Sequence, residues 1–183
     1  MTKHNIAMKL VNGEETYAAF IQEAVPQAKK SLWIGTADIK NMHQDRGNGY
    51  RPFLKTLEEL CCRGVEVRLL HAREPGPRFR ADFDRLPKLR NSPYFERVLC
   101  PRVHFKCILV DCRRAYIGSA NLTGAGMGPR SDKSRNFEMG IDTEDPATIG
   151  RLMELYESVF LGYECETCRF RNRCPDPPIL TEK

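Results

Sequence analysis

Two runs of strand-forming residues lie almost back to back in the middle of the chain, at residues 103–110 and 114–119. β-Branched and aromatic side chains are frequent in both runs, and a few polar residues around Cys112 and Arg113 separate them. A connection this short joins antiparallel neighbours and is typical of a β-hairpin. The sequence therefore predicts a hairpin here, and we expect a two-residue turn at its tip.

This hairpin is expected to bring polar side chains together. A two-residue turn pairs Lys106 with Ser119 and His104 with Asn121. Pairing partners and alternate residues of a strand share a face, so these four side chains form one patch. Asp111 lies seven residues from His104, roughly 23 Å along a straight strand at about 3.3 Å per residue. We therefore assign Asp111 to the turn, where aspartate is favoured.

Such a patch suits chemistry on a phosphodiester. Phosphate anions repel anionic nucleophiles, whereas a neutral imidazole such as that of His104 is able to attack phosphorus. The Lys106 ammonium then offsets the negative charge that develops. These two residues predict a phosphodiesterase.

The block resembles the signature of the phospholipase D superfamily, His-x-Lys-x4-Asp-x6-Gly-Ser-x-Asn. Every signature position is present, at His104, Lys106, Asp111, Gly118, Ser119 and Asn121. The resemblance implies a metal-independent reaction in which one histidine attacks phosphorus, forming a phosphohistidine, and a second protonates the leaving oxygen. It also implies that Glu138, in the next strand-like run, hydrogen-bonds the nucleophilic histidine and fixes its tautomer.

One copy of the motif is present, because the other histidines, His4, His43 and His71, do not begin a His-x-Lys. A single motif in a short chain is similar to the endonuclease-type members of the superfamily, which pair two protomers across a two-fold axis. The resemblance implies a homodimer in which His104 of a second chain is the missing general acid.

The fold expected from the remaining pattern is α/β, a mixed β-sheet flanked by helices, as in the phospholipase D-like fold. Strand-like and helical segments alternate, and residues 38–50 and 73–93 are expected to be loops. The expected strands, besides the hairpin, are residues 31–35, 65–70, 95–99 and 136–142, and the expected helices are 14–30, broken near Pro26, 51–62, and one that begins at Asp145-Pro146. We expect a catalytic domain at residues 1–162 and a cysteine-rich tail at 163–183.

Charge favours nucleic acid as the substrate. The chain has 29 Lys and Arg against 24 Asp and Glu, and residues 63–102 alone carry the whole excess of +5. Phosphate contacts dominate affinity for nucleic acids, so a basic segment leading into His104 suits such a backbone. A glycine-rich loop with Arg130, Lys133 and Arg135 follows Asn121 and is a candidate substrate-binding lip.

The tail carries a second pattern, Cys165-x2-Cys168-x5-Cys174-Pro. Three cysteines this close suit metal ligation. Locally the segment resembles those of iron–sulfur nucleases, in which a distant cysteine completes a [4Fe–4S] cluster; zinc suits four thiolates equally well. For the fourth ligand we expect Cys62, which lies off the apolar face of its helix, rather than Cys100.

Composition and the chain start bound the remaining possibilities. Hydrophobic residues are 41% and charged residues 29%, no apolar run has membrane-spanning length, and residues 1–9 lack a signal-peptide pattern. We therefore expect a cytoplasmic nuclease that acts on DNA or RNA without a membrane. Two alternatives stand beside it: a phospholipase or phosphatidyltransferase with the same chemistry, and a metal-containing nucleic-acid-binding or sensor protein without turnover.

Overall fold

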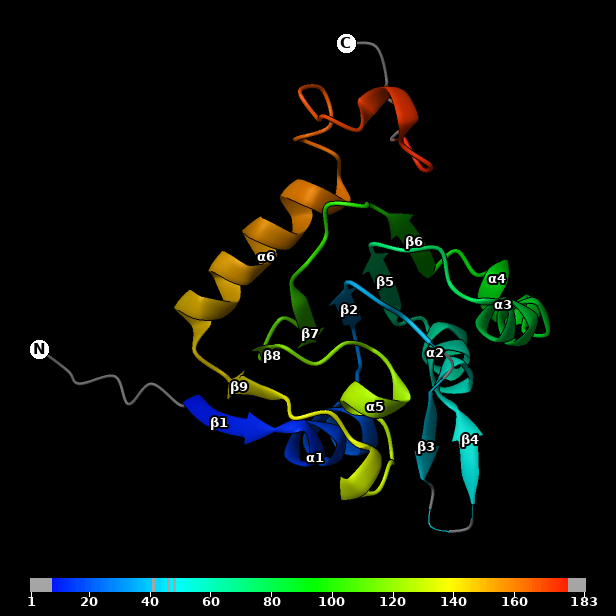
Figure 1. The fold of residues 1–183 in the computed structure, drawn as a ribbon, viewed down its shortest axis with the longest axis vertical. Coiled ribbons are helices and arrows are strands. Elements are labelled where there is room, and N and C mark those ends of the chain that lie inside the picture. Colours follow the sequence, from blue (N-terminus) through cyan, green and yellow to red (C-terminus); the bar gives the residue numbers. More distant parts are fainter. Residues whose placement is uncertain (1–7, 41, 46, 48, 178–183) are drawn as a thin grey trace, which may run out of the picture.

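A seven-stranded mixed sheet lies at the centre of the computed structural model, which describes residues 8–40, 42–45, 47 and 49–177 (Figure 1). The strand order is β1-β9-β8-β7-β2-β5-β6; β2, β5 and β6 run parallel, and the other neighbours are antiparallel. The strands are β1 (Met8–Asn12), β2 (Ser31–Thr36), β5 (Glu66–His71), β6 (Phe95–Leu99), β7 (Lys106–Val110), β8 (Arg114–Gly118) and β9 (Met139–Thr143). The expected mixed α/β sheet is confirmed.

A separate two-stranded sheet occupies part of the segment expected to be a loop. It pairs β3 (His43–Asp45) with β4 (Tyr50–Pro52). The segment is polar and lacks an apolar alternation, so its sequence gave no strand signal. A tertiary contact holds this small sheet in place: Gln44 is buried, and the Gln44 side-chain amide donates to the Ile21 carbonyl.

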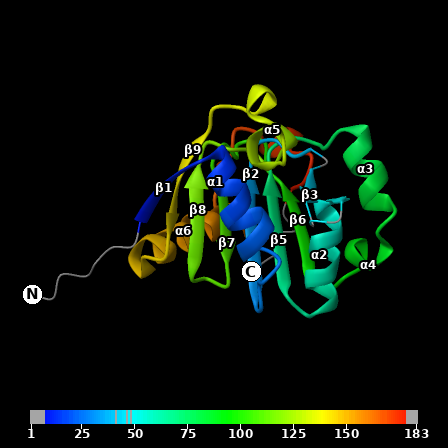
Figure 2. The same ribbon diagram turned by 90° about the horizontal axis from the view of Figure 1, so that it is seen from below.

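Helices cover both faces of the large sheet. The helices of the described chain are α1 (Gly13–Thr16), continued by the π-helix η1 (Tyr17–Ala24), α2 (Phe53–Cys62), α3 (Pro77–Asp84), α4 (Pro87–Arg90), α5 (Gly124–Met127), α6 (Pro146–Phe160) and the 3-10 turns η2 (Asp132–Ser134) and η3 (Arg171–Arg173). Figure 2 shows α1 in front of the strands and α6 behind them. The expected loop at 73–93 thus contains two short helices, each beginning at a proline.

The sheet separates two hydrophobic cores. On β2, Leu32 and Ile34 pack in the core shared with η1 and α2, whereas Trp33 packs with Tyr156 and Phe160 of α6. Side chains of a strand alternate between faces, so a strand buried on both sides is apolar throughout. This explains why the central strands have continuous apolar sequences.

Helix α6 begins where the sequence predicts. Asp145 is its N-cap, and the Asp145 carboxylate accepts the Thr148 N–H at 2.7 Å. Pro146 occupies the first turn, where no N–H is needed. Within the described chain, no helix is both long and apolar enough to cross a lipid bilayer.

Candidate active site

The hairpin forms with a register one residue away from the expected one. Lys106 pairs with Gly118 instead of Ser119, and His104 precedes the first residue of β7. Asp111 and Cys112 both adopt the left-handed conformation, with φ of 53° and 55°. The loop therefore has three residues, 111–113, instead of two. The predicted two-residue turn is wrong, because a left-handed pair of non-glycine residues leaves little trace in sequence.

Asp111 lies in this turn and joins it to β2. Its carboxylate accepts the backbone N–H groups of Lys29, Lys30 and Ser31 at 2.7–3.0 Å. Partial burial raises the pKa of Asp111, but these N–H donors outweigh it and hold the pKa below its ordinary value. The contacts give Asp111 an architectural position at the end of β7 opposite to His104.

Three motif residues nevertheless meet in one cavity. His104, Lys106 and Asn121 line a space of about 300 Å³, together with residues from the ends of β2 and β5 and from the 101–103 turn. His104 is exposed, whereas Lys106 is 8% exposed. The Lys106 ammonium donates to the His104 carbonyl at 2.7 Å, so it holds the backbone of the histidine.

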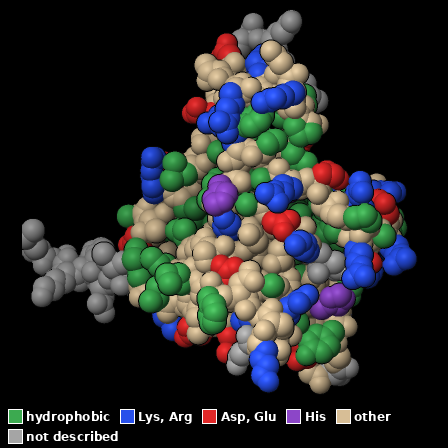
Figure 3. Space-filling model, viewed as in Figure 1, with side chains coloured by type: hydrophobic (Ala, Val, Ile, Leu, Met, Phe, Trp, Pro, Cys, Tyr) green, Lys and Arg blue, Asp and Glu red, His purple; other side chains and the backbone are tan. Residues whose placement is uncertain are grey.

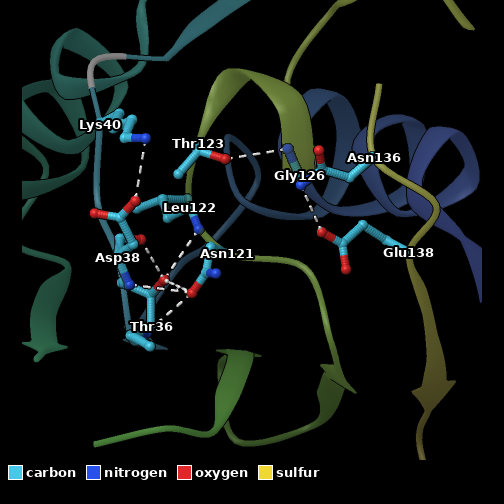
Figure 4. A network of polar contacts seen from close by, with 10 residues as sticks. Thr36, Asp38, Lys40, Asn121, Leu122, Thr123, Gly126, Asn136 and Glu138 are labelled. Carbon is cyan, nitrogen blue, oxygen red and sulfur yellow. Dashed lines mark hydrogen bonds and ion pairs between the residues drawn. The ribbon is translucent and has the colours of Figure 1, made fainter. Parts of the chain in front are cut away.

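Asn121 is oriented by the chain that follows β2 (Figure 4). Its Oδ1 accepts the N–H groups of Ala37 and Asp38, both at 3.1 Å, and the Thr36 hydroxyl at 3.3 Å. The single proton of the Thr36 hydroxyl is shared with the Asp38 carbonyl, and the hydroxyl oxygen accepts the Leu122 N–H. Because these donors fix the amide oxygen, the amide nitrogen of Asn121 is left to face a ligand.

Ser119 and Glu138 form a second polar group beside the cavity. The Ser119 hydroxyl donates to Glu138 Oε2. The Asn136 amide donates to Glu138 Oε1 at 3.1 Å (Figure 4). Among the described residues, no hydrogen bond joins Glu138 to His104, and neither Ser119 nor Glu138 lines the cavity of His104. The orienting role of Glu138 therefore stays a prediction.

Gly118 is required by close packing. A Cβ at this position lies 2.6 Å from the Met139 carbonyl and closer still to the Tyr116 hydroxyl. Tyr116 is fully buried, and its hydroxyl accepts the Ala120 N–H at 3.1 Å. Gly118 thus allows Tyr116 to brace the backbone between Ser119 and Asn121.

The three basic residues of the loop after Asn121 lie in different environments. Arg130 is exposed and lines a surface hollow of about 780 Å³ with Lys40 and Arg78. Lys133 is exposed on η2. Arg135 instead packs over the Tyr17 ring, 5.9 Å from its centroid, and donates to the Gly13 carbonyl. Of the three predicted substrate ligands, Arg135 has a structural contact that its sequence did not reveal.

Other polar residues join the site from segments that carry no motif. Asp38 lines both the His104 cavity and the basic hollow, and Arg73 lines the His104 cavity. Lys40 pairs with Asp38 at 3.3 Å. The sequence signal for these two residues was that each follows a predicted strand. Asp38 follows β2 and Arg73 follows β5; these strands are parallel neighbours, so their carboxyl ends share one sheet edge.

The cysteines of the tail gather with Cys100. Cys100, Cys165, Cys168 and Cys174 line one cavity of about 340 Å³ beside the end of α6. The Phe170 N–H donates to Cys168 Sγ at 3.5 Å, and with the Arg102 guanidinium it lowers the pKa of the Cys168 thiol. No three cysteine, histidine or carboxylate side chains in the described chain converge closely enough to hold one metal ion.

Cys62, the expected fourth ligand, does not line this cavity. It is exposed at the end of α2, a helix that packs on the opposite face of the sheet from α6. The helical pattern indicated that Cys62 is exposed, but it could not indicate which face of the sheet α2 covers.

Comparison with known proteins gives the family. The model of a phospholipase D-like domain, described as "Cardiolipin synthase, PLD-like domain", matches residues 21–161. The chain therefore belongs to the phospholipase D-like family. A comparison with curated proteins found no significant match.

Solved structures share the fold. NucT from Helicobacter pylori superposes with a TM-score of 0.63 at 14% identity, over 85% of this chain and 96% of its own. Nuc from Salmonella typhimurium, a phospholipase D family member, gives 0.60 at 17%, over 94% and 99%. Phosphatidylserine synthase from Haemophilus influenzae gives 0.59 at 15%, over 87% of this chain and 40% of its own.

Proposed function

We propose that the protein is a homodimeric, metal-independent endonuclease that hydrolyses phosphodiester bonds of DNA or RNA through His104. The observation that carries the proposal is the cavity in which His104, Lys106 and Asn121 meet in a chain of this family. It combines an exposed imidazole, a buried cation and an amide whose oxygen is already bonded, so that its nitrogen is the group left to donate. These are the groups that attack on a phosphate requires.

The proposed reaction has two steps. An imidazole nitrogen of His104 attacks phosphorus, the ester P–O bond breaks, and the leaving oxygen takes a proton from a general acid. Water then attacks the phosphohistidine, the P–N bond breaks, and the general acid is restored by the proton that this water loses. Lys106 and Asn121 stabilise charge on the phosphoryl oxygens.

The general acid is proposed to be His104 of a second copy. Among the described residues that line the cavity, His104 is the one histidine. Apolar side chains lie exposed nearby on β1 and β9: Leu10 is 72% and Met139 68% exposed, and Ile141 is the cross-strand partner of Leu10. Figure 3 shows hydrophobic side chains gathered over these strands.

The position of this apolar face supports the dimer. Phe137 and Met139 are exposed and flank Glu138, which bonds Ser119 of the motif. An exposed apolar patch beside an incomplete site is a typical protein interface. A two-fold interface there would bring two copies of the motif close together.

Nucleic acid is the proposed substrate because basic residues continue from the cavity. Asp38 lies at the boundary between the His104 cavity and the hollow lined by Lys40, Arg78 and Arg130. Cations spaced along a hollow suit the repeated phosphates of a strand. This arrangement extends the basic excess of residues 63–102 into a defined surface.

Cleavage in the presence of EDTA tests the proposal. Purified protein is incubated with single- and double-stranded DNA and RNA in excess chelator, and products are resolved by gel. We expect cutting by the wild type, loss of cutting below detection in His104→Ala, and retention in His43→Ala, because His43 is an exposed residue of β3 outside the cavity. Cleavage that survives His104→Ala, or that requires added Mg²⁺, contradicts the mechanism.

Phosphatidyl transfer is the second candidate, and one observation favours it. A groove of about 510 Å³, lined mainly by apolar side chains, runs beside α6 and includes Phe105, which follows His104. Acyl chains suit such a groove. Release of headgroup from phospholipid vesicles, together with no cutting of any nucleic acid, would favour this candidate over the nuclease.

A further inference from the structure

The side chains of the C-terminal tail are arranged around its cysteines. Within residues 163–177, all of which the structure describes, the side chains that are not exposed are Cys165, Cys168, Phe170 and Cys174. A segment with one half-buried aromatic residue has too little apolar surface to order itself. Another interaction is therefore needed to stabilise the tail in the conformation that places its three thiols at the cavity.

A fourth thiol reaches the same place from the core. Cys100 lies at the start of the turn between β6 and β7, and it lines the same 340 Å³ cavity as the three tail cysteines. Figure 1 shows the tail beyond the ends of α6 and β6. The two segments are 65 residues apart in sequence, so spacing alone did not identify this cysteine.

The backbone on both sides of this cavity is held in place. Cys100 donates its N–H to the His71 carbonyl at 2.8 Å and accepts the Val103 N–H at 3.0 Å. The Leu99 N–H donates to the Asp176 carboxylate at 2.8 Å, which ties the end of the tail to β6. The Phe170 N–H contacts Cys168 Sγ, a bond typical of cysteines that bind metals.

We propose that Cys100, Cys165, Cys168 and Cys174 hold one iron–sulfur cluster, with Cys100 as the fourth thiolate. Four thiolates suit either a cluster or a single zinc ion. A tetrahedral zinc with Zn–S bonds of about 2.3 Å draws its thiolates to within about 4 Å of one another. Here all four cysteines line one cavity of about 340 Å³, which has room for a multi-atom cluster with its thiolates further apart.

The cluster would also position the catalytic turn, an extension that rests on the proposed function. Pro101 lines both the cysteine cavity and the His104 cavity, and Cys100 lies four residues before His104. A metal bound to Cys100 fixes this turn and the tail together. Loss of the metal is therefore expected to lower cleavage without changing any group that contacts the phosphate.

Metal analysis of the full-length protein, purified without oxygen, tests the site directly. We expect about four irons and about four acid-labile sulfides per chain, with a broad absorption in the visible range and a brown colour. Cys100→Ser is expected to lose most of this iron and absorption, whereas Cys62→Ser keeps both and is the matched control. Circular dichroism of both variants checks that the sheet still forms.

Folding and metal loss are separated by reconstitution. If Cys100→Ser folds poorly, the wild-type chain is stripped of metal and titrated with iron and sulfide, and the thiols protected from alkylation are identified by mass spectrometry. Protection of Cys100 with the three tail cysteines supports the proposal. A colourless protein with one zinc overturns the cluster, and a protein without metal, or protection of Cys62 in place of Cys100, overturns the site. These readouts require no cleavage, so they stand or fall independently of the nuclease activity.

Discussion

Asn121 is held by its oxygen and presents its nitrogen. Three donors at the end of β2 fix Oδ1, so the Nδ2 hydrogens are directed by the protein and not by solvent. A donor oriented before the substrate binds contributes more to catalysis than one that must reorient. The two ends of the Asn121 amide thus have different roles: the oxygen is bonded within the protein, and the nitrogen donates to the substrate.

The Asn121→Asp variant tests this division. The carboxylate keeps an acceptor for the Ala37 and Asp38 N–H groups but replaces the donor with a second oxygen. We expect a melting temperature close to that of the wild type and a fall in the cleavage rate of about 10²-fold or more. Thermal unfolding and single-turnover cleavage in EDTA measure the two effects.

Asn91→Asp is the control for added charge, because Asn91 is exposed at the end of α4. It should match the wild type in both assays. Full activity in Asn121→Asp would show that the amide nitrogen does not act on the substrate.

At the level of elements, one side chain ties the turn of the β7–β8 hairpin to the start of β2, the strand with which β7 pairs. Asp111 accepts three consecutive backbone N–H groups at the start of β2, and its own N–H donates to the Ser31 carbonyl at 2.8 Å. This connection compensates for the left-handed backbone of Asp111 and Cys112. It also fixes the register in which β7 pairs with β2, and therefore where Lys106 lies.

Asp111→Asn is expected to destabilise the fold by about 1–2 kcal/mol at neutral pH, since hydrogen bonds to a charged acceptor become bonds to a neutral one. The folded pKa of Asp111 lies below the ordinary value of 3.8, so its contribution is complete above that value and is lost as pH falls through the lowered pKa. Urea unfolding of both proteins between about pH 6 and about pH 2 measures this difference.

The two unfolding free energies should converge as the pH falls, because protonated aspartic acid and asparagine are then both neutral. A difference that stays constant over this range would mean that the charge of Asp111 does not stabilise the turn. The variant also reports on the active site, because a shifted hairpin would displace His104 and Lys106 from the residues that follow β2 and line the same cavity.

Element boundaries were predictable where local chemistry defines them. Asp145-Pro146 starts α6 because a carboxylate cap and a proline each act within one turn. The helix expected over 14–30 with a break near Pro26 ends at Ala24, two residues before that proline, whereas β1 was not predicted. β1 is an edge strand whose partner β9 lies more than 120 residues away, so its pairing depends on the assembled sheet.

For the whole molecule, the dimer is the prediction that joins fold to function. The exposed face of β1 and β9 lies beside Glu138 and Ser119, so a second copy bound there would complete the site. We expect the wild type to sediment as a dimer. Met139→Asp places a charge in this face and is expected to give a folded monomer without cleavage activity, as measured by analytical ultracentrifugation and the EDTA assay.

Tyr50→Asp is the matched control, because Tyr50 is equally exposed but lies on β4 in the separate small sheet. It should remain a dimer and cut normally. An active monomer, in either the wild type or Met139→Asp, would refute a shared active site.

The sequence by itself determined the family, the mixed α/β sheet and the residues of the motif. Strand alternation, helix caps and the spacing from His104 to Asn121 are local patterns. They can be read from neighbouring positions in the sequence, because they do not depend on which distant segments pack against them. The tertiary structure alone decided that Asn121 is held by residues 36–38, that Arg135 packs on Tyr17, and that Cys100 lies with the tail cysteines. These contacts join segments about 65 to 120 residues apart, and they exist only once the sheet has brought those segments together.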